Sequence, residues 1–246
     1  MRQIHASSLS ALNNPQSAIR NPQSEDFTRY DQKLEFILRN SARIFAEKGY
    51  HSTSMRDISR ETNVSLAGLY YYCKSKEELL FLIQDNCFGR VLERLQARLE
   101  ETTEPVAKLR LVIDNHLSFF AANMAEMKVL SHEADSLEGE MQAHVSGQKQ
   151  QYTKLVRRLL SEVQQAQTGG TPKVDLTVAT YALFGMMNWI YNWYDPAGAL
   201  SVNGLVDNIT RLFLNGFLAG ADCEEIQFTP RAARTERLSV WRAPQT

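Results

Sequence analysis

Two helix caps separated by a turn place the strongest constraint on how this 246-residue chain can fold. Ser54 is followed three residues later by Asp57, the spacing of a capping box, in which a hydroxyl and a carboxylate satisfy backbone N–H groups at a helix start. The next Thr-Asn pair favours a turn, and Ser65 is placed to cap a second short helix. Residues 53–80 therefore predict a helix-turn-helix whose second helix runs from Leu66 to Cys73.

The outer face of this second helix combines small residues at its start with phenols after them, namely Leu66, Ala67, Gly68, Tyr70, Tyr71 and Tyr72. Small side chains would let the helix approach base edges in a major groove, and phenol hydroxyls could reach phosphates. A further cap at Ser75 starts a third helix with Lys76 in its first turn, where an ammonium opposes the helix dipole. A DNA phosphate would offset that cost. The alternative is that the tyrosines belong to the core and the lysine is solvated.

This segment resembles the DNA-binding domain of the TetR family of bacterial transcriptional regulators. The similarity covers about residues 32–82 and is carried by GYHSTSMRDISRETNVSLAGLYYYCKSKEELL. It implies that Ser54, Arg56 and residues 65–68 face DNA, and that residues 70–72 and Lys76 mostly contact phosphates. Three positions depart from the usual pattern: Thr62 and Ala67 replace a common Ala and Gly, and Cys73 stands where an inward Phe is expected, so it underfills the core.

Composition and charge fit such a protein. The chain is 43% hydrophobic and 22% charged, as in ordinary globular proteins. Residues 1–76 hold eleven Lys and Arg against seven Asp and Glu, whereas the remainder is acidic. This asymmetry suits an N-terminal part that meets phosphates, although solvated surface charge could also produce it.

Several signals point to a cytoplasmic protein without metal or cofactor. The three cysteines lack ligand-like spacing, which favours reduced thiols. No apolar run reaches the ~18 residues of a membrane span, and the N-terminus lacks the apolar region of a signal peptide. We therefore expect no membrane association.

Helical periodicity without strand-like alternation predicts an all-α fold with two functional domains. We expect a disordered N-terminal arm at 1–27, the DNA-binding domain at 28–75, a ligand-binding and dimerisation domain at 76–220, and a flexible tail at 221–246. The predicted helices are Tyr30–Lys48, the two helices of the motif, 76–101, one after Pro105, a short one at 124–130, 140–165, Pro172–Tyr194 and 201–219.

The last two helices are the most apolar of the chain and suit a hairpin that packs against a second copy of itself. The alternative is an internal core. The resemblance adds that this helix pair usually forms the dimer interface in the TetR family. The expected interface residues are Trp189, Trp193, Leu205, Ile209, Leu212 and Phe213.

Residues 127–141 and 189–216 resemble the ligand domains of TetR relatives similar to fatty-acid-degradation repressors, which respond to acyl-coenzyme A thioesters. The resemblance implies a small apolar effector, with long-chain acyl-coenzyme A as a candidate. Apolar stripes on the middle helices could enclose such a chain. The candidate ligand-binding residues are His116, Phe119, Phe120, Met124, Met127, Tyr152, Phe184, Met187 and Asn188.

The leading interpretation is a dimeric repressor that binds a near-palindromic operator in double-stranded DNA and leaves it when an apolar effector binds. Two alternatives remain: a DNA-binding regulator with an aromatic or drug-like inducer or with no effector, and an all-α enzyme. The enzyme is disfavoured because the chain has no phosphate-binding glycine loop, nucleophile elbow or zinc-binding helix motif, so no catalytic residue is assigned. His116, His132, Glu133 and His144 fit no single helix face, so no metal site is expected.

Overall fold

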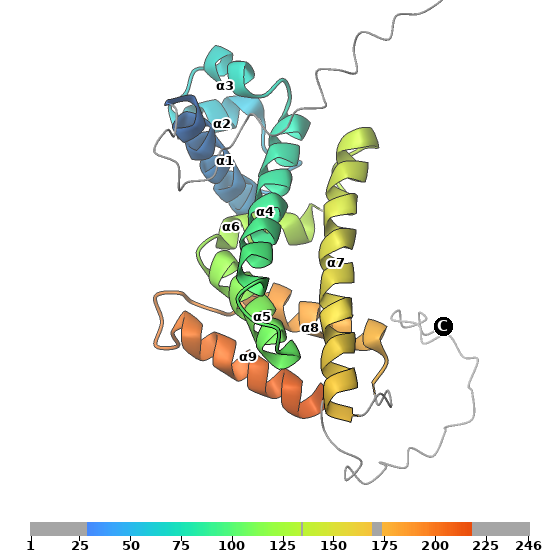
Figure 1. The fold of residues 1–246 in the computed structure, drawn as a ribbon. Coiled ribbons are helices and arrows are strands. Elements are labelled where there is room, and N and C mark those ends of the chain that lie inside the picture. The colour runs from blue at the N-terminus through green and yellow to red at the C-terminus, as the bar shows by residue number, and fades with distance from the viewer. Residues whose placement is uncertain (1–28, 134, 169–173, 218–246) are drawn as a thin grey trace, which may run out of the picture.

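The computed structural model describes residues 29–133, 135–168 and 174–217. This part of the chain contains helices and no strand, which confirms the predicted all-α class (Figure 1). The helices are α1 Arg29–Lys48, α2 Met55–Thr62, α3 Leu66–Tyr72, α4 Lys76–Leu99, α5 Pro105–Ala121, α6 Met124–His132, α7 Gly139–Thr168, α8 Leu176–Asn188, the 3-10 helix η2 Trp189–Asn192 and α9 Val202–Phe217. The predicted disordered arm and flexible tail lie outside the described residues.

The first predicted cap is present as expected. The Ser54 hydroxyl accepts a hydrogen bond from the Asp57 N–H at 3.2 Å, and the Ser54 N–H donates to the Asp57 carboxylate at 2.9 Å. The turn after α2 forms at Asn63, whose φ of 51° lies in the left-handed region that Asn tolerates. The Ser65 hydroxyl then accepts from the Gly68 N–H at 3.0 Å and starts α3.

The third cap forms in part. The Ser75 hydroxyl accepts from the Glu78 N–H at 3.0 Å, so α4 begins at Lys76 as predicted. The Glu78 carboxylate accepts from the Lys74 N–H, one residue before the position that a capping box requires.

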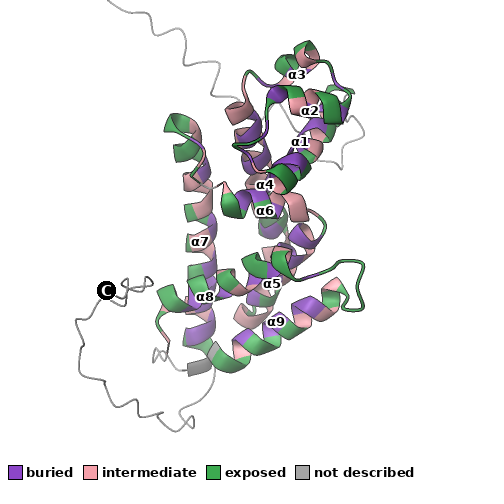
Figure 2. Cartoon of the chain, turned by 180° about the vertical axis from the view of Figure 1, so that it is seen from behind, coloured by how far each residue is buried: buried purple, intermediate pink, exposed green. Residues whose placement is uncertain are grey.

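The buried side chains form two cores that share helices. One core joins α1, α2, α3 and the first half of α4, and it also includes Val129 of α6, Leu137 of the segment before α7, and Val145 of α7. The other joins the second half of α4 to α5, α6, α7, α8, η2 and α9. Helices α4, α6 and α7 therefore contribute to both cores, and α4 and α6 lie between the helix-turn-helix and the larger helical body (Figures 1 and 2).

The helix predicted from Pro172 to Tyr194 differs from the observed one at both ends. Residues 169–173 lie outside the described part, and α8 starts after Asp175, whose carboxylate accepts from the N–H groups of Thr177 and Val178. At its other end the α-helix tightens into η2. The predicted turn after it is present, with the Gly198 N–H bound to the Asp195 carbonyl at 3.0 Å.

No helix in the described ranges is both long enough and apolar enough to cross a membrane.

Candidate DNA-binding surface and ligand cavity

Helix α3, which carries the predicted reading face, lies at one end of the molecule (Figure 1). Tyr70 and Tyr71 are exposed, with 72% of Tyr71 accessible, while Leu69 is fully buried beneath them. The other predicted DNA-facing residues divide into an exposed group, Ser54, Arg56, Ser65 and Ala67, and a partly buried group, Leu66, Gly68, Tyr72 and Lys76. An exposed short helix carrying small residues and phenols has the shape that a major groove accepts.

Tyr72 is held against α1. Its ring centroid lies 4.8 Å from that of Tyr30, and Tyr71 packs edge-on against both rings. Offset and edge-to-face contacts of this kind stabilise aromatic pairs. The three phenols therefore fix the orientation of the end of α3 relative to α1.

Neighbouring side chains within the protein leave little space for a side chain at Gly68. A Cβ at this position would lie 3.1 Å from the Ser65 hydroxyl and 3.1 Å from a methyl group of Val64. A larger residue would require these two side chains, one of which caps α3, to shift by a few tenths of an ångström. The close approach to base edges expected from the sequence stays a prediction.

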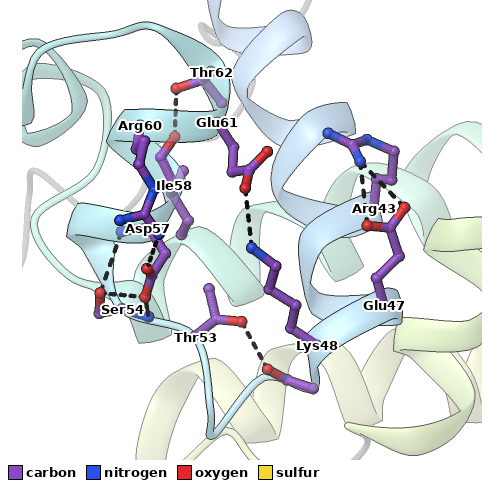
Figure 3. A network of polar contacts seen from close by, with 11 residues as sticks. Arg43, Glu47, Lys48, Thr53, Ser54, Asp57, Ile58, Arg60, Glu61 and Thr62 are labelled. Carbon is purple, nitrogen blue, oxygen red and sulfur yellow. Dashed lines mark hydrogen bonds and ion pairs between the residues drawn. The ribbon is translucent and has the colours of Figure 1, made fainter.

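Most cations around α2 are already neutralised by carboxylates. Arg60 pairs with Asp57 at 2.6 Å, and the salt bridge between Lys48 and Glu61 spans 3.0 Å (Figure 3). Arg43 pairs with Glu47 along α1 in the same region (Figure 3). Hydrogen bonds from Ser54 lower the pKa of the Asp57 carboxyl to about 2, so its charge persists at any physiological pH.

Arg56 and Lys74 remain as exposed cations beside α3, and neither pairs with a carboxylate among the described residues. Lys74 was not among the residues expected from the sequence to contact DNA. Its position directly after α3 and its exposure make it a second candidate for a phosphate contact.

Lys76 does not present its ammonium to solvent as the phosphate assignment requires. The ammonium donates to the main-chain carbonyls of Tyr50 at 2.8 Å and Thr53 at 2.9 Å, with that of His51 at 3.5 Å. It also lies 4.3 Å from the centroid of the Tyr50 ring. All three ammonium donors are thus directed at the turn between α1 and α2. In this conformation Lys76 attaches α4 to that turn through two short hydrogen bonds, and its third donor makes only a long contact.

A cavity of about 690 Å³ lies among α4, α5, α6, α7, α8 and η2. Six of the residues predicted to bind a ligand line it: His116, Phe120, Met127, Tyr152, Phe184 and Asn188. The other lining residues are Phe88, Val91, Leu130, Ser131, Lys149, Gln150, Thr153, Lys154, Tyr181, Gly185, Trp189 and Tyr191. Its size and its largely apolar and aromatic wall are those of a small-molecule site.

Three predicted ligand residues lie elsewhere. Met187 is fully buried in the main core and does not line the cavity. Met124 packs at the edge of the same core, and Phe119 lines a separate, smaller cavity of about 160 Å³. These three residues do not line the cavity, because the sequence identified the helices around it without fixing which side of each helix faces it.

The inner wall of the cavity carries a polar pair, His116 and Tyr152. The two rings stack with centroids 5.9 Å apart, and the Tyr152 hydroxyl lies 3.2 Å from His116 Nδ1. Burial lowers the pKa of His116 to about 3, against a small opposing effect of Asn188. Burial also raises the pKa of Tyr152. Both groups are therefore neutral at physiological pH and can take part in hydrogen bonds without adding charge.

Helix α6 contacts both the cavity and the DNA-binding core. Met127, Leu130 and Ser131 line the cavity, while Val129, on another side of the helix, is buried with the side chains of α1 to α3. The segment after α6 is also attached to α4, since Gln84 donates to the Glu133 carbonyl at 3.0 Å. A displacement of α6 at the cavity would therefore directly change the packing of α6 against α1.

The large apolar side chains exposed in the described residues fall into two groups. One surrounds α1 and α3. The other occupies α8, η2, the following loop and α9, and we call it the α8–α9 patch: Val178, Tyr181, Trp189, Trp193, Leu200 and Leu212. Trp189 is 60% accessible and Leu212 is 67% accessible. Such a patch on an otherwise folded surface is typical of a protein–protein interface.

The predicted dimer residues divide between this patch and the interior. Trp189, Trp193 and Leu212 belong to the patch, but Leu205, Ile209 and Phe213 are buried within their own chain. Helix α9 is amphipathic, and it directs these three residues toward the main core. Their assignment to a dimer interface is corrected accordingly.

No cluster of three or more potential metal ligands occurs in the described ranges. Two of the remaining histidines have protein partners: His144 lies 2.7 Å from the Asp85 carboxylate, and His132 lies 3.1 Å from the Tyr191 hydroxyl.

Comparison with known families and proteins agrees with this arrangement. Residues 37–83 match the family of bacterial regulatory proteins called tetR, and residues 102–217 match the tetracyclin repressor-like C-terminal domain. The chain is 26% identical over 164 residues to the fatty acid metabolism regulator protein of Bacillus subtilis, covering 63% of this chain and 82% of that protein.

Two solved structures extend the comparison. The crystal structure of AibR in complex with isovaleryl coenzyme A and operator DNA is 29% identical, with a TM-score of 0.64 over 73% of this chain and 97% of AibR. A regulator of the TetR/AcrR family from Thermobifida fusca is 32% identical, with a TM-score of 0.55 over 76% of this chain and 98% of that one. With its helix-turn-helix, its helical C-terminal domain and these relatives, the chain belongs to the TetR family of transcriptional regulators.

Proposed function

We propose that this protein is a dimeric repressor that binds a near-palindromic operator in the cytoplasm and is released from it by an apolar effector, with an acyl-coenzyme A thioester as the leading candidate. The observation that carries the proposal is the cavity of about 690 Å³ whose wall includes α6, a helix that also fills the DNA-binding core. AibR is described in complex with an acyl-coenzyme A and operator DNA, and the Bacillus subtilis relative is named for fatty acid metabolism.

The proposed dimer forms through the α8–α9 patch. Two reading helices related by a twofold axis would then enter successive major grooves about 34–36 Å apart, or a small multiple of a turn apart. The DNA face consists of α3 with Ser54, Arg56 and Ser65, with Lys74 as an added phosphate contact. Selection of binding sites from random duplexes should enrich near-palindromic sequences. Enrichment of asymmetric sites alone would contradict the dimer.

The proposed release follows from differential affinity. A ligand can lower operator affinity only if it binds the released arrangement more tightly, and a 100-fold effect requires about 2.7 kcal/mol of coupling. Burial of a few methylenes at about 0.8 kcal/mol each supplies that amount, provided that the DNA-bound arrangement leaves them less buried. Met127 and Leu130 on α6 are placed to sense the filled cavity, and Val129 is placed to pass the shift to α1.

The test is a titration of acyl thioesters of increasing chain length against a fluorescent operator, with free coenzyme A as the control. Release should strengthen with chain length and be absent for coenzyme A alone. By reciprocity, operator DNA should weaken ligand binding by the same factor. Absence of release at every chain length would exclude acyl thioesters as effectors.

A second candidate effector is a planar aromatic compound. Seven of the lining side chains are Phe, Tyr or Trp, which could stack on such a ligand: Phe88, Phe120, Tyr152, Tyr181, Phe184, Trp189 and Tyr191. Release by aromatic compounds but by no acyl thioester would select this candidate.

A further inference from the structure

The charges on the wall of the cavity are all of one sign. Lys149 and Lys154, both on α7, line the cavity, and no Asp or Glu does so within the described part of the chain. His116 and Tyr152 add no charge because burial keeps both neutral. The cavity therefore carries two positive charges inside the acidic C-terminal part of the protein.

Lys149 is the more informative of the two lysines. Its side chain is partly buried, and its ammonium lies 5.7 Å from the ring centroid of Phe88 across the cavity wall. It forms no salt bridge with any described carboxylate; Asp135 acts on it only at longer range. Burial lowers the pKa of Lys149, which is the expected effect of removing an ammonium from water without giving it an anion.

An unpaired, partly buried ammonium is costly to the folded protein. A solvated lysine would point away from the cavity, and a structural lysine would carry a carboxylate or carbonyl partner, as Lys76 and Lys108 do. Phe88 supplies a weak cation–π contact, which is a poor substitute for an anion.

We propose that the effector is an anion with an apolar body, and that Lys149 binds its negative group while the aromatic wall receives the apolar part. This inference rests on the proposed ligand site. The negative group is a carboxylate at the end of the apolar chain or a phosphate of coenzyme A, since both offer an ammonium the same charge-assisted hydrogen bonds. Lys154, which is exposed at the cavity edge, provides a second and weaker attraction.

The experiment compares two pairs of ligands that differ in charge and share the same ten-carbon chain. Decanoate is paired with decanol, and decanoyl-coenzyme A with decanoyl-pantetheine, which lacks the nucleotide phosphates. Affinities are measured by calorimetry with the full-length protein, and its tryptophan fluorescence, to which Trp189 in the cavity wall contributes, gives a second readout. In the wild type, at least one anion should bind about tenfold or more tightly than its neutral partner.

Lys149→Met keeps the apolar stem and removes the charge, so the preference for that anion should fall to about twofold or less while affinity for the neutral partner persists. Lys149→Arg should retain the preference. Lys128→Met is the matched control, because Lys128 is exposed on α6 and does not line the cavity. Loss of the preference for decanoate alone would identify a carboxylate, and loss for the thioester pair alone would identify a phosphate.

Equal binding of charged and neutral partners by the wild type, a preference that survives in Lys149→Met, or failure of all four ligands to bind would overturn the inference. These outcomes are separable from failure of the proposed function. Operator release by decanoyl-coenzyme A with an unchanged preference in Lys149→Met would sustain the regulator and reject the role of Lys149. A Lys149-dependent preference without operator release would support the role of Lys149 and reject the proposed regulator function.

Discussion

Replacing Lys76 by methionine separates two roles that this residue could have. If its ammonium mainly holds the turn between α1 and α2, Lys76→Met should destabilise the protein and leave the salt dependence of DNA binding nearly unchanged. If it mainly binds a phosphate, the change should reduce the slope of log K against log salt by about 0.9 and leave stability intact. Methionine preserves the length of the apolar stem, so the comparison isolates the charge.

The magnitude follows from the contacts. Two of the hydrogen bonds, to Tyr50 at 2.8 Å and to Thr53 at 2.9 Å, are short, and the third is at the limit of bonding. The Tyr50 carbonyl keeps a second donor, the Thr53 N–H at 3.2 Å, so the main loss is at Thr53. A hydrogen bond to a charged group contributes about 1.5–3 kcal/mol. Because the site is only partly buried, we expect a loss of about 2–3 kcal/mol.

Lys74→Met is the matched control. Lys74 is two residues away and exposed, and its ammonium has no partner among the described residues. It should show the opposite result: unchanged stability and a slope reduced by about 0.9. Urea unfolding followed by circular dichroism gives the stability, and fluorescence anisotropy with a nonspecific duplex at several salt concentrations gives the slope. A stable Lys76→Met protein with a reduced slope would refute the reasoning from the carbonyl contacts.

Three further predictions follow from other contacts. His116 has a pKa of about 3 in the folded protein against 6.5 in the unfolded chain, so the unfolded state binds a proton first as the pH falls and the free energy of unfolding decreases below pH 6.5. At pH 5 this lowers the free energy of unfolding by about 2 kcal/mol. His116→Phe should remove that part of the pH dependence when stability is measured by urea titration at several pH values. Leu212→Glu should leave the monomer folded, because Leu212 is exposed, yet shift the sedimentation coefficient from dimer to monomer; a dimer of unchanged stability would contradict the use of the α8–α9 patch. Burial raises the pKa of the Cys73 thiol from 9.0 to about 11. In a variant that retains Cys73 as its only cysteine, alkylation of this thiol should therefore be at least about 100-fold slower than alkylation of a cysteine in a peptide. A peptide-like rate would show that the thiol is accessible.

The sequence was most informative where structure is determined by neighbouring residues. The caps at Ser54, Ser65 and Ser75 depend on atoms three residues apart, and each caps its helix in the structure. Cys73 was expected on the inner side of the motif and is 2% accessible there. The start of η2 was not predictable in the same way, since Trp, Ile, Tyr and Asn include no helix breaker.

The sequence was least informative where distant segments meet. The partners of Lys76 are 23 to 26 residues earlier in the chain, so the local helix dipole suggested a phosphate where tertiary structure supplies carbonyls. Lys149 was overlooked because a single lysine in a long amphipathic helix is usually solvated, and only the packing of α4 beside α7 places Phe88 against it. Met187 was misassigned for a related reason, since a helix that is apolar on several sides does not reveal which side borders a cavity.

The sharing of α6 and α7 between the two cores limits how regulators of this kind can be recombined. Val129, Leu137 and Val145 fill space beneath α1 to α4, although they are encoded 50 or more residues after the reading helix. A fusion that joins α1, α2, α3 and the first half of α4 of this protein to an unrelated effector domain would leave that space empty, at a cost of several kcal/mol for three missing aliphatic side chains. Biosensors made by exchanging DNA-binding domains between such repressors should therefore transfer these three positions together with the DNA-binding domain.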